Sequence, residues 1–394
     1  MISERQLFLN HIAQTSSSPI MLEIDRAEGV YMISRDGKKY IDLISGISVS
    51  NLGHSHPAVV QAIQDQVAKH MHLMVYGEYI QSPQVKYASL LTQQLPNTLD
   101  NVYFVNSGSE SIEGALKLAK RYTGRSEVVA FKNAYHGSTH GALSVMGNEE
   151  FKNSFRPLVP GVRFLEFNNL IDIEKITEST ACVLIEPIQG EGGIILPNKG
   201  YLQKLRQRCD DVGALLIFDE IQTGFGRTGS LFAFQYFDVV PDVFTIAKAM
   251  GGGLPIGAFV SSQEIMSVFK SNPALGHITT FGGHPVSCAA ALASLSTLLD
   301  EKIIESIPEK EKLLRALLIH DKIKEIRGIG LFFAVDLGDS ELVQSFIQKL
   351  LNDGIVVDWF LFDSKSIRIA PPLIISEEQI NTVCNKIIKA LDSI

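Results

Sequence analysis

Two apolar stretches that each end on a charged residue constrain the fold of this chain most. Residues 214–218 read Ala-Leu-Leu-Ile-Phe and run into Asp219 and Glu220, whereas residues 243–247 read Val-Phe-Thr-Ile-Ala and run into Lys248. Such wholly apolar runs are typical of strands buried on both faces, as in parallel sheets. A lysine at the end of a buried strand is costly unless something neutralises or uses it, and Schiff-base chemistry is one use. A strand-end lysine that points to water is the alternative.

Three further apolar runs, at residues 102–105, 128–131 and 182–185, also end in loops of polar residues and glycines. Stretches with helical periodicity separate them. This alternation predicts an α/β fold with a mainly parallel sheet. Ligands bind such sheets at the carboxyl ends of the strands, so we expect a site along that edge.

The loop after the first of these runs has the features of an anion site. Ser107 and Glu110 have the spacing of a capping box, and apolar residues follow at helical period from Ile112. Backbone N–H groups and the positive end of the helix dipole would face one point, beside the hydroxyls of Ser107 and Ser109. No lysine follows Gly108 as in a Walker A sequence, so the loop suits a single phosphate.

Two other positions point to a ligand. Tyr135 and His136 follow the run 128–131 beside a glycine, where they are placed to stack on and contact a planar ring; a core tyrosine with a turn is the alternative. Arg368 lies between two apolar strand positions and therefore needs a carboxylate partner, from the protein or from a ligand.

The spacing Gly224-x-Gly226-x-x-Gly229 matches a dinucleotide-binding pattern. Asp219 and Glu220 would place two negative charges against the pyrophosphate, and no amphipathic helix of the required kind follows. We therefore do not predict a dinucleotide site.

The histidines and cysteines predict no metal site. His54 and His56 have no third ligand nearby, and Pro57 begins a helix, so they fit a helix-entry turn. The cysteines are scattered and fit buried thiols in a reducing compartment; they are Cys182, Cys209, Cys288 and Cys384.

Length and net charge limit the classes of protein to which this chain can belong. A chain of 394 residues favours one large and one smaller domain. A net charge of -8 gives no electrostatic footprint for nucleic acid. No run of 18 apolar residues occurs, and the first residues lack a basic stretch followed by an apolar one. We expect a cytoplasmic protein without a membrane anchor.

Together these segments resemble the class III (subgroup II, ω-type) aminotransferases, which are pyridoxal-phosphate (PLP) enzymes of fold type I. The nearest branches are the acetylornithine/ornithine and ω-amino acid aminotransferases. Each motif alone is a weak signal. Their occurrence together in the family's order supports the resemblance, which extends from Gly29 to about Ile387. The motifs are residues 42–46 (DLISG), 53–57 (GHSHP), 106–110 (NSGSE), 135–137 (YHG), 186–191 (EPIQGE), 219–229 (DEIQTGFGRTG), the lysine segment and 280–283 (TFGG).

The resemblance implies a large domain with a mainly parallel, seven-stranded type of sheet flanked by helices, and a smaller α+β domain built from both chain ends. It places the N-terminal segment of the small domain at 1–50, the large PLP-binding domain at 51–295 and the C-terminal small domain at 296–394. It also implies a homodimer with shared active sites.

The roles of the family's site residues carry over to matching positions. Lys248 would be the Schiff-base lysine that also moves the proton during catalysis, and Asp219 would pair with the pyridine nitrogen. Thr280 would reach the phosphate from a second subunit. The remaining cofactor-binding positions are Ser107, Gly108 and Ser109 at the phosphate, Tyr135 and Ile221 on the two ring faces, Gln222 at the ring hydroxyl, and His136 and Glu186.

Arg368 matches the arginine that holds the carboxylate beside the reacting amino or keto group. Glu191 matches the glutamate that covers this arginine when the amine substrate has no carboxylate there. One pocket would thus take two unlike substrates without leaving the arginine unpaired. A fixed structural ion pair between Glu191 and Arg368 is the alternative.

Three positions depart from the family pattern. Ser138 stands where the ornithine, acetylornithine and 4-aminobutyrate branches have an arginine for a substrate carboxylate, so recognition of a second carboxylate is in doubt. Ile47 falls where the ornithine branch has a tyrosine. His284 replaces the asparagine of the usual Gly-Gly-Asn-Pro sequence.

We therefore expect a PLP-dependent transaminase that moves an amino group from a primary amine or (ω-)amino acid to a 2-oxo acid in a ping-pong cycle. Its partners would be these small molecules, with no nucleic acid and no membrane. An aminomutase or a decarboxylase of the same fold is the alternative, because the cofactor residues alone do not decide which bond at Cα breaks. A PLP-binding protein without turnover is a further, less favoured one.

Overall fold

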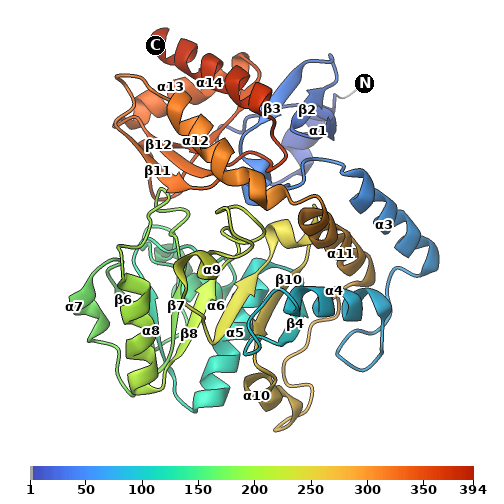
Figure 1. Ribbon diagram of the computed structural model, residues 1–394, viewed down its shortest axis with the longest axis vertical. Helices are drawn as coiled ribbons and strands as arrows, with labels where there is room; N and C mark the ends of the chain where they lie inside the picture. The colour runs from blue at the N-terminus through green and yellow to red at the C-terminus, as the bar shows by residue number, and fades with distance from the viewer. Residues whose placement is uncertain (1–2) are drawn as a thin grey trace.

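The computed structural model describes residues 3–394 and is built around a central seven-stranded sheet (Figure 1). In sheet order the strands are β4 (Asn101–Val105), β10 (Gly257–Ser261), β9 (Val243–Ile246), β8 (Leu215–Asp219), β7 (Thr180–Ile185), β5 (Glu127–Phe131) and β6 (Val162–Leu165). β10 runs antiparallel to both neighbours, and the other pairs are parallel. The predicted α/β fold with a mainly parallel sheet is confirmed.

Helices cover this sheet and explain its apolar strands. α5 (Gly108–Thr123) packs against β9 and β10, and α8 (Tyr201–Val212) packs against β7 and β8. Every residue of β7, β8 and β9 is buried, so no face of these strands needs polar side chains. The alternation of strand and helix therefore brings the polar loop after each parallel strand to one edge of the sheet.

Both ends of the chain build a second, smaller α+β region, which lies above the large sheet in Figure 1. One sheet holds β1 (Ile24–Glu28), β2 (Tyr31–Ser34), β3 (Lys39–Asp42) and β13 (Ile355–Val356). The other holds β11 (Glu325–Ile329), β12 (Phe332–Asp336), β15 (Ser366–Ile369) and β14 (Asp358–Trp359). Because β13 pairs with β3, the C-terminal part of the chain completes the N-terminal sheet. This confirms the predicted α+β layer.

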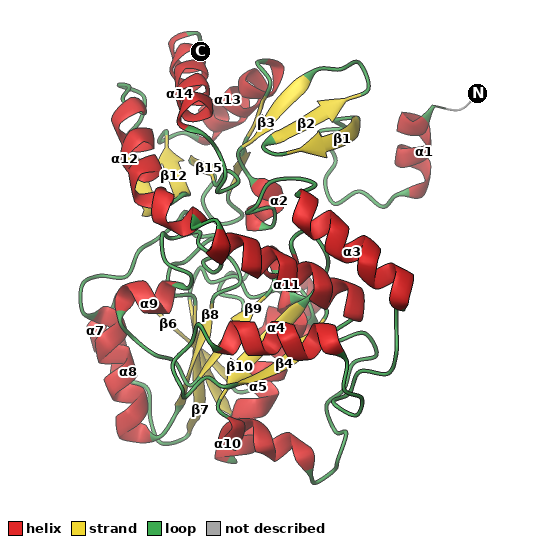
Figure 2. Ribbon diagram, turned by 45° about the vertical axis from the view of Figure 1, so that its right-hand side comes forward, coloured by secondary structure: helices red, strands yellow, loops and turns green. Residues whose placement is uncertain are grey.

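The remaining elements connect or cover these sheets (Figure 2). The helices are α1 (Glu4–His11), α2 (Ser45–Ser48), α3 (Pro57–Lys69), α4 (Ser82–Thr92), α6 (His140–Ser144), α7 (Leu170–Ile173), α9 (Ala233–Phe237), α10 (Gln263–Met266), α11 (Pro285–Asp300), α12 (Ile307–Leu317), α13 (Ser340–Asn352) and α14 (Glu377–Asp392). Four 3-10 turns complete the chain: η1 (Asn153–Phe155), η2 (Lys248–Gly251), η3 (Ser267–Lys270) and η4 (Ile303–Ser306). The domain limits stay predictions, and the one between residues 295 and 296 falls inside α11.

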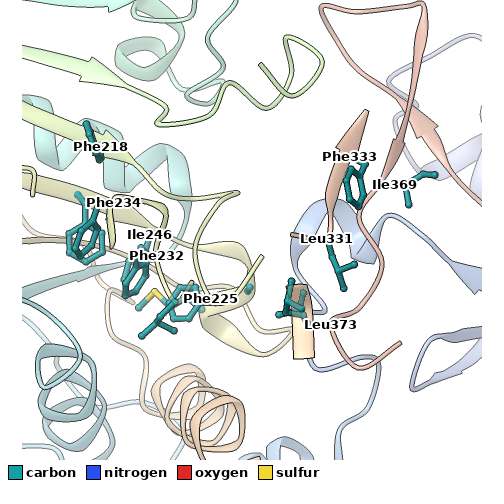
Figure 3. Packing of buried hydrophobic residues seen from close by; sticks show 14 of the residues in the cluster. Phe218, Phe225, Phe232, Phe234, Ile246, Leu331, Phe333, Ile369 and Leu373 are labelled. Atoms are coloured by element: carbon teal, nitrogen blue, oxygen red, sulfur yellow. The ribbon is translucent and has the colours of Figure 1, made fainter. Parts of the chain in front are cut away.

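The two regions share one hydrophobic core (Figure 3). It joins side chains of the large region, such as Phe225 and Phe232, to Leu331 and Leu373 of the smaller one. Arg227 crosses the same junction, fully buried, and its Nη1 donates to the carbonyls of Leu331 at 2.8 Å and Pro371 at 2.6 Å. Burial lowers the pKa of Arg227 to about 9. Apolar packing and this buried cation hold the two regions together at the edge where the strands end.

Candidate active site

A cavity of about 460 Å³ lies at the carboxyl ends of the parallel strands, against the first turn of α5. Polar groups from loops far apart in the sequence meet here, as expected at this edge of an α/β sheet. Ten predicted positions line it: Ser107, Gly108, Ser109, Tyr135, His136, Glu186, Asp219, Ile221, Gln222 and Lys248.

Lys248 lies two residues after the end of β9 and has a left-handed backbone, with φ 49°. The strand thus ends abruptly, and the side chain borders the cavity. Burial lowers the pKa of Lys248 from 10.5 to about 8, while the negative charge of Glu191 opposes this shift. A large share of this amine is therefore neutral near physiological pH and able to act as a nucleophile or base.

Asp219 ends β8 and presents its carboxylate to the same cavity. One oxygen accepts from the backbone N–H of Ile221 at 3.0 Å, and the other lies 2.7 Å from Nδ1 of the buried His136. The next residue, Glu220, is directed elsewhere and accepts from the backbone N–H groups of Ala233 and Phe234 at the start of α9. The two adjacent carboxylates therefore have different tasks, since successive strand side chains point to opposite faces.

The first turn of α5 supplies the anion site. Ser107 is the N-cap and accepts from the backbone N–H of Glu110 at 3.2 Å. The Glu110 side chain accepts from the backbone of Asn106 at 2.7 Å, so half of the predicted capping box forms. Gly137 has φ 124°, and a Cβ there would lie 2.1 Å from Oγ of Ser109, so this turn requires a glycine. The N-terminal N–H groups are left to bind a phosphate.

Glu186 is a second acid at the cavity wall. It accepts from the backbone N–H groups of Tyr135 and Gly190, both at 3.1 Å. Burial and the nearby charge of Asp219 raise the pKa of Glu186 well above its usual range. The protonated form of Glu186, which can donate a hydrogen bond, is therefore favoured.

Glu191 and Arg368 form a buried ion pair beside the cavity. Nη2 of Arg368 donates to both carboxylate oxygens of Glu191, at 2.8 and 2.7 Å. Glu191 also accepts from Nε2 of Gln222 at 3.1 Å and from the backbone N–H of Leu361 at 3.2 Å. Burial raises the pKa of Glu191, but the charges of Arg368 and Lys248 outweigh this effect and hold it below its usual range. Gln222 thus links the ion pair to the cavity.

Besides Glu191 and Arg368, three predicted residues lie outside the cavity lining. Thr280 is exposed and borders a different hollow with Tyr76 and His277. Ser138 is exposed at the rim, 3.4 Å from the hydroxyl of Tyr135. Ile47 is half-buried in a short left-handed turn, where residues 45–48 all have positive φ.

The cavity also includes residues that were not singled out from the sequence. Val49, which follows the left-handed turn, lines it in place of Ile47. Residues 253–256 line it as well, and the signal that could have found them is their position directly after Lys248 and its glycines.

The lining suits a flat, phosphorylated aldehyde cofactor. An anion site, a reactive amine and a carboxylate face one cavity of suitable size. Two buried polar atoms, Oε1 of Gln222 and Nε2 of His136, have no hydrogen-bond partner among residues 3–394. Buried polar atoms are rarely left unsatisfied, so a bound group with polar substituents fits here.

Comparison with known proteins agrees with this chemistry. The family model described as aminotransferase class-III matches residues 12–391. The chain belongs to the class III aminotransferase family. It is 40% identical over 384 residues to the acetylornithine aminotransferase of Methanopyrus kandleri, covering 97% of this chain and 96% of the relative.

Solved structures show the same fold. A transaminase from the marine bacterium Virgibacillus superposes with a TM-score of 0.93 at 28% identity, covering 99% of this chain and 98% of that one. The ornithine aminotransferase from Toxoplasma gondii superposes with a TM-score of 0.91 at 29% identity, covering 100% and 95%. This class III aminotransferase therefore has the PLP fold type I architecture.

As a class III aminotransferase, the chain uses pyridoxal phosphate and moves an amino group from a primary amine or amino acid to a 2-oxo acid in a ping-pong cycle. In the described range, 3–394, no helix is long and apolar enough to cross a membrane.

The lowered pKa of Lys248 predicts its reactivity in cofactor-free protein. Only a neutral amine reacts with acetic anhydride, so acetylation of Lys248 is expected to reach half its maximal rate near pH 8. Peptide mass spectrometry after brief labelling measures this, with urea-unfolded protein as control. Glu191→Gln is expected to move the midpoint lower, because a negative charge that favours the ammonium form is lost. A midpoint near 10.5 in the folded protein would contradict the assignment.

Proposed function

We propose that Lys248 and Asp219 act on opposite parts of the cofactor, Lys248 as the Schiff-base lysine and Asp219 as the partner of the pyridine nitrogen. The observation that carries this proposal is that both line one cavity with the first turn of α5. Pyridoxal phosphate supplies an aldehyde that bonds to amines and a ring that takes up electrons from Cα. The lowered pKa of Lys248 suits it to act as a base near neutral pH, and its amine would move the proton at Cα of the substrate.

The other lining residues orient the cofactor. His136 positions the Asp219 carboxylate through its 2.7 Å contact and so favours a protonated pyridine nitrogen. Tyr135 and Ile221 would contact the two faces of the ring, and Oε1 of Gln222 is a free acceptor for the ring hydroxyl. The phosphate would bind Gly108 together with the nearby serines Ser107 and Ser109 and the helix dipole. Glu186 would add a donor at the wall.

Glu191 and Arg368 serve as the switch between the two half-reactions. A 2-oxo acid carries a carboxylate beside its keto group, and this carboxylate would replace Glu191 on Arg368. A donor without such a carboxylate would leave the ion pair closed. In both cases the buried guanidinium keeps a counter-charge, which supports the exchange over a fixed pair.

The part of the pocket near Ser138, away from the reacting amine, favours donors without a second carboxylate at that end. Ser138 supplies no cation, and no arginine lines the cavity within the described chain. β-Amino acids and plain amines are therefore the preferred donors. Relatives named acetylornithine aminotransferase, at 40% and 41% identity, favour a second candidate donor, acetylornithine.

The enzyme acts as a homodimer in the cytoplasm. Phe281 is 53% exposed and its ring lies 4.9 Å from that of His72, while Ile80 nearby is 95% exposed. An apolar surface of this kind next to Thr280 supports burial against a second copy, which would receive Thr280 at its phosphate. The four cysteines are free and buried, which supports a reducing compartment.

Replacement of Lys248 tests the assignment directly. Lys248→Ala is expected to lower steady-state transamination by about a thousandfold or more, because the proton-transfer base is lost. The visible absorbance that borohydride removes should vanish with it. Lys199→Ala, at an exposed lysine, is the control. Retention of both signals in Lys248→Ala would exclude the role.

A donor panel tests the pocket. Loss of the visible absorbance on mixing is expected to be faster with β-amino acids and plain amines than with ornithine. Ser138→Arg should raise kcat/KM for donors with a distal carboxylate by about tenfold, since a guanidinium pairs with carboxylates. Ser138→Gln is the uncharged control. Fast turnover of acetylornithine by the unaltered enzyme would instead establish the second candidate.

Thr280→Ala tests the shared site. Loss of one hydrogen bond to a charged phosphate is expected to weaken PLP binding about tenfold or more, although Thr280 lies outside the cavity of its own subunit. Titration of cofactor-free protein, with the dimer monitored by light scattering, measures this. Ser271→Ala, at an exposed serine of the same loop region, is the control. Unchanged affinity would contradict a contribution from Thr280 across the interface.

A further inference from the structure

Arg368 has a second carboxylate beside it, on the neighbouring strand. Asp358 of β14 is the direct cross-strand partner of Arg368 in β15, and β14 is the edge strand of its sheet. Side chains opposite one another in adjacent strands lie on the same face and interact. Oδ1 of Asp358 lies 3.5 Å from Nε of Arg368.

The contacts of Arg368 leave room for this partner. A guanidinium has five N–H donors, and both hydrogen bonds to Glu191 start from Nη2. Nε and Nη1 of Arg368 are buried without a hydrogen-bond partner in the described chain, and so is Oδ1 of Asp358. The ring of Phe360 lies 4.6 Å from the guanidinium carbon and excludes water from that face. Two unsatisfied groups of opposite charge thus face each other.

Asp358 carries a charge at neutral pH. Burial, together with the charges of Glu191 and Asp42, raises its pKa to about 6 against the attraction of Arg368. Above pH 6 the guanidinium therefore has two carboxylates around it. Only Glu191 is also bonded to Gln222 at the cavity.

We infer that Asp358 is a second counter-ion of Arg368, which keeps the arginine neutralised whenever Glu191 turns away from it. This inference rests on the proposed switch between half-reactions. A buried arginine that loses its only partner is strongly destabilised, and this would oppose opening of the ion pair. With Asp358 beside Nε, the guanidinium keeps one carboxylate while Nη1 and Nη2 receive that of the 2-oxo acid. Asp358 thereby determines how easily the pocket changes between its two substrate classes.

The two carboxylates should substitute for each other toward donors that bring no carboxylate. If either remains, Arg368 stays paired and the donor binds. If both are removed, the donor leaves a bare buried cation behind, whereas a 2-oxo acid supplies the missing charge. Loss of both carboxylates therefore impairs the half-reaction with the donor and favours that with the 2-oxo acid. A folding defect would impair both half-reactions.

A double-mutant cycle on PLP-loaded enzyme tests this inference. The half-reactions with the fastest donor of the panel that lacks an adjacent carboxylate, and with pyruvate and 2-oxoglutarate, are followed by absorbance. Glu191→Gln and Asp358→Asn singly should lower kcat/KM for the donor by less than about fivefold. The double variant should lower it about a hundredfold and lower KM for the 2-oxo acids about tenfold. Glu191→Gln/Asp358→Glu should restore donor turnover.

Other outcomes would count either against the role of Asp358 or against the proposed function. Effects that simply multiply, or a parallel loss of both half-reactions, would overturn the role of Asp358. Absence of any half-reaction in the unaltered enzyme would count against the proposed function instead. Asp321→Asn, at an exposed aspartate of the same region, is the matched control.

If the double variant does not fold, Glu191→Gln alone decides the question. Its donor rate relative to the unaltered enzyme should fall as the pH is lowered from 7 to 4, because Asp358 is then protonated. In this variant the pKa of Asp358 lies below about 6, because the Glu191 charge that raises it is lost. A constant ratio over this range would refute the inference.

Discussion

Burial of charge in one dry cavity is the constraint on which the rest of this structure depends. An ammonium, a guanidinium and several carboxylates lie within or beside the same cavity, and water does not screen them. Burial and neighbouring charges shift their pKa values in different directions: the pKa of Lys248 is lowered to about 8, that of Glu186 is raised, and that of Glu191 is lowered beside Arg368. Catalytic chemistry near neutral pH follows from this balance and not from any single residue.

The fold makes such a balance possible because it collects short loops at one edge. The central parallel strands β7, β8 and β9 are buried throughout and lead into polar loops at one edge, so Asp219 and Lys248 reach the same cavity although 29 positions separate them in the sequence. The smaller region then closes over this edge and brings Arg368 from β15. Arg227 and the shared core hold the two regions in place.

Much of this could be predicted from the sequence, because the informative residues lie at strand ends. Ten of the eleven positions predicted for the cofactor, from strand ends and from the family resemblance, line one cavity. Positions that depend on long-range geometry are harder to predict. Val49 lines the cavity and Ile47 does not, and no periodicity reveals the left-handed turn before Val49. Thr280 lies outside the cavity, so its role at the phosphate of a second subunit stays a prediction.

Asp358 could not be found from the sequence for a related reason, because only the register of the strands makes it a neighbour of Arg368. It stands ten positions before Arg368, in a stretch without any motif, and only the pairing of β14 with β15 places the two opposite each other.

The surrounding contacts also limit what can move. Nε of Arg327 donates to the carbonyl of Gly193 at 2.8 Å, and its Nη2 donates to Asp363 at 2.6 Å. Arg327 thereby ties the loop after Glu191 to the turn before Arg368, so we expect the partners to exchange by side-chain rotation. A switch this small needs a counter-ion already at hand, and the register of β14 provides one.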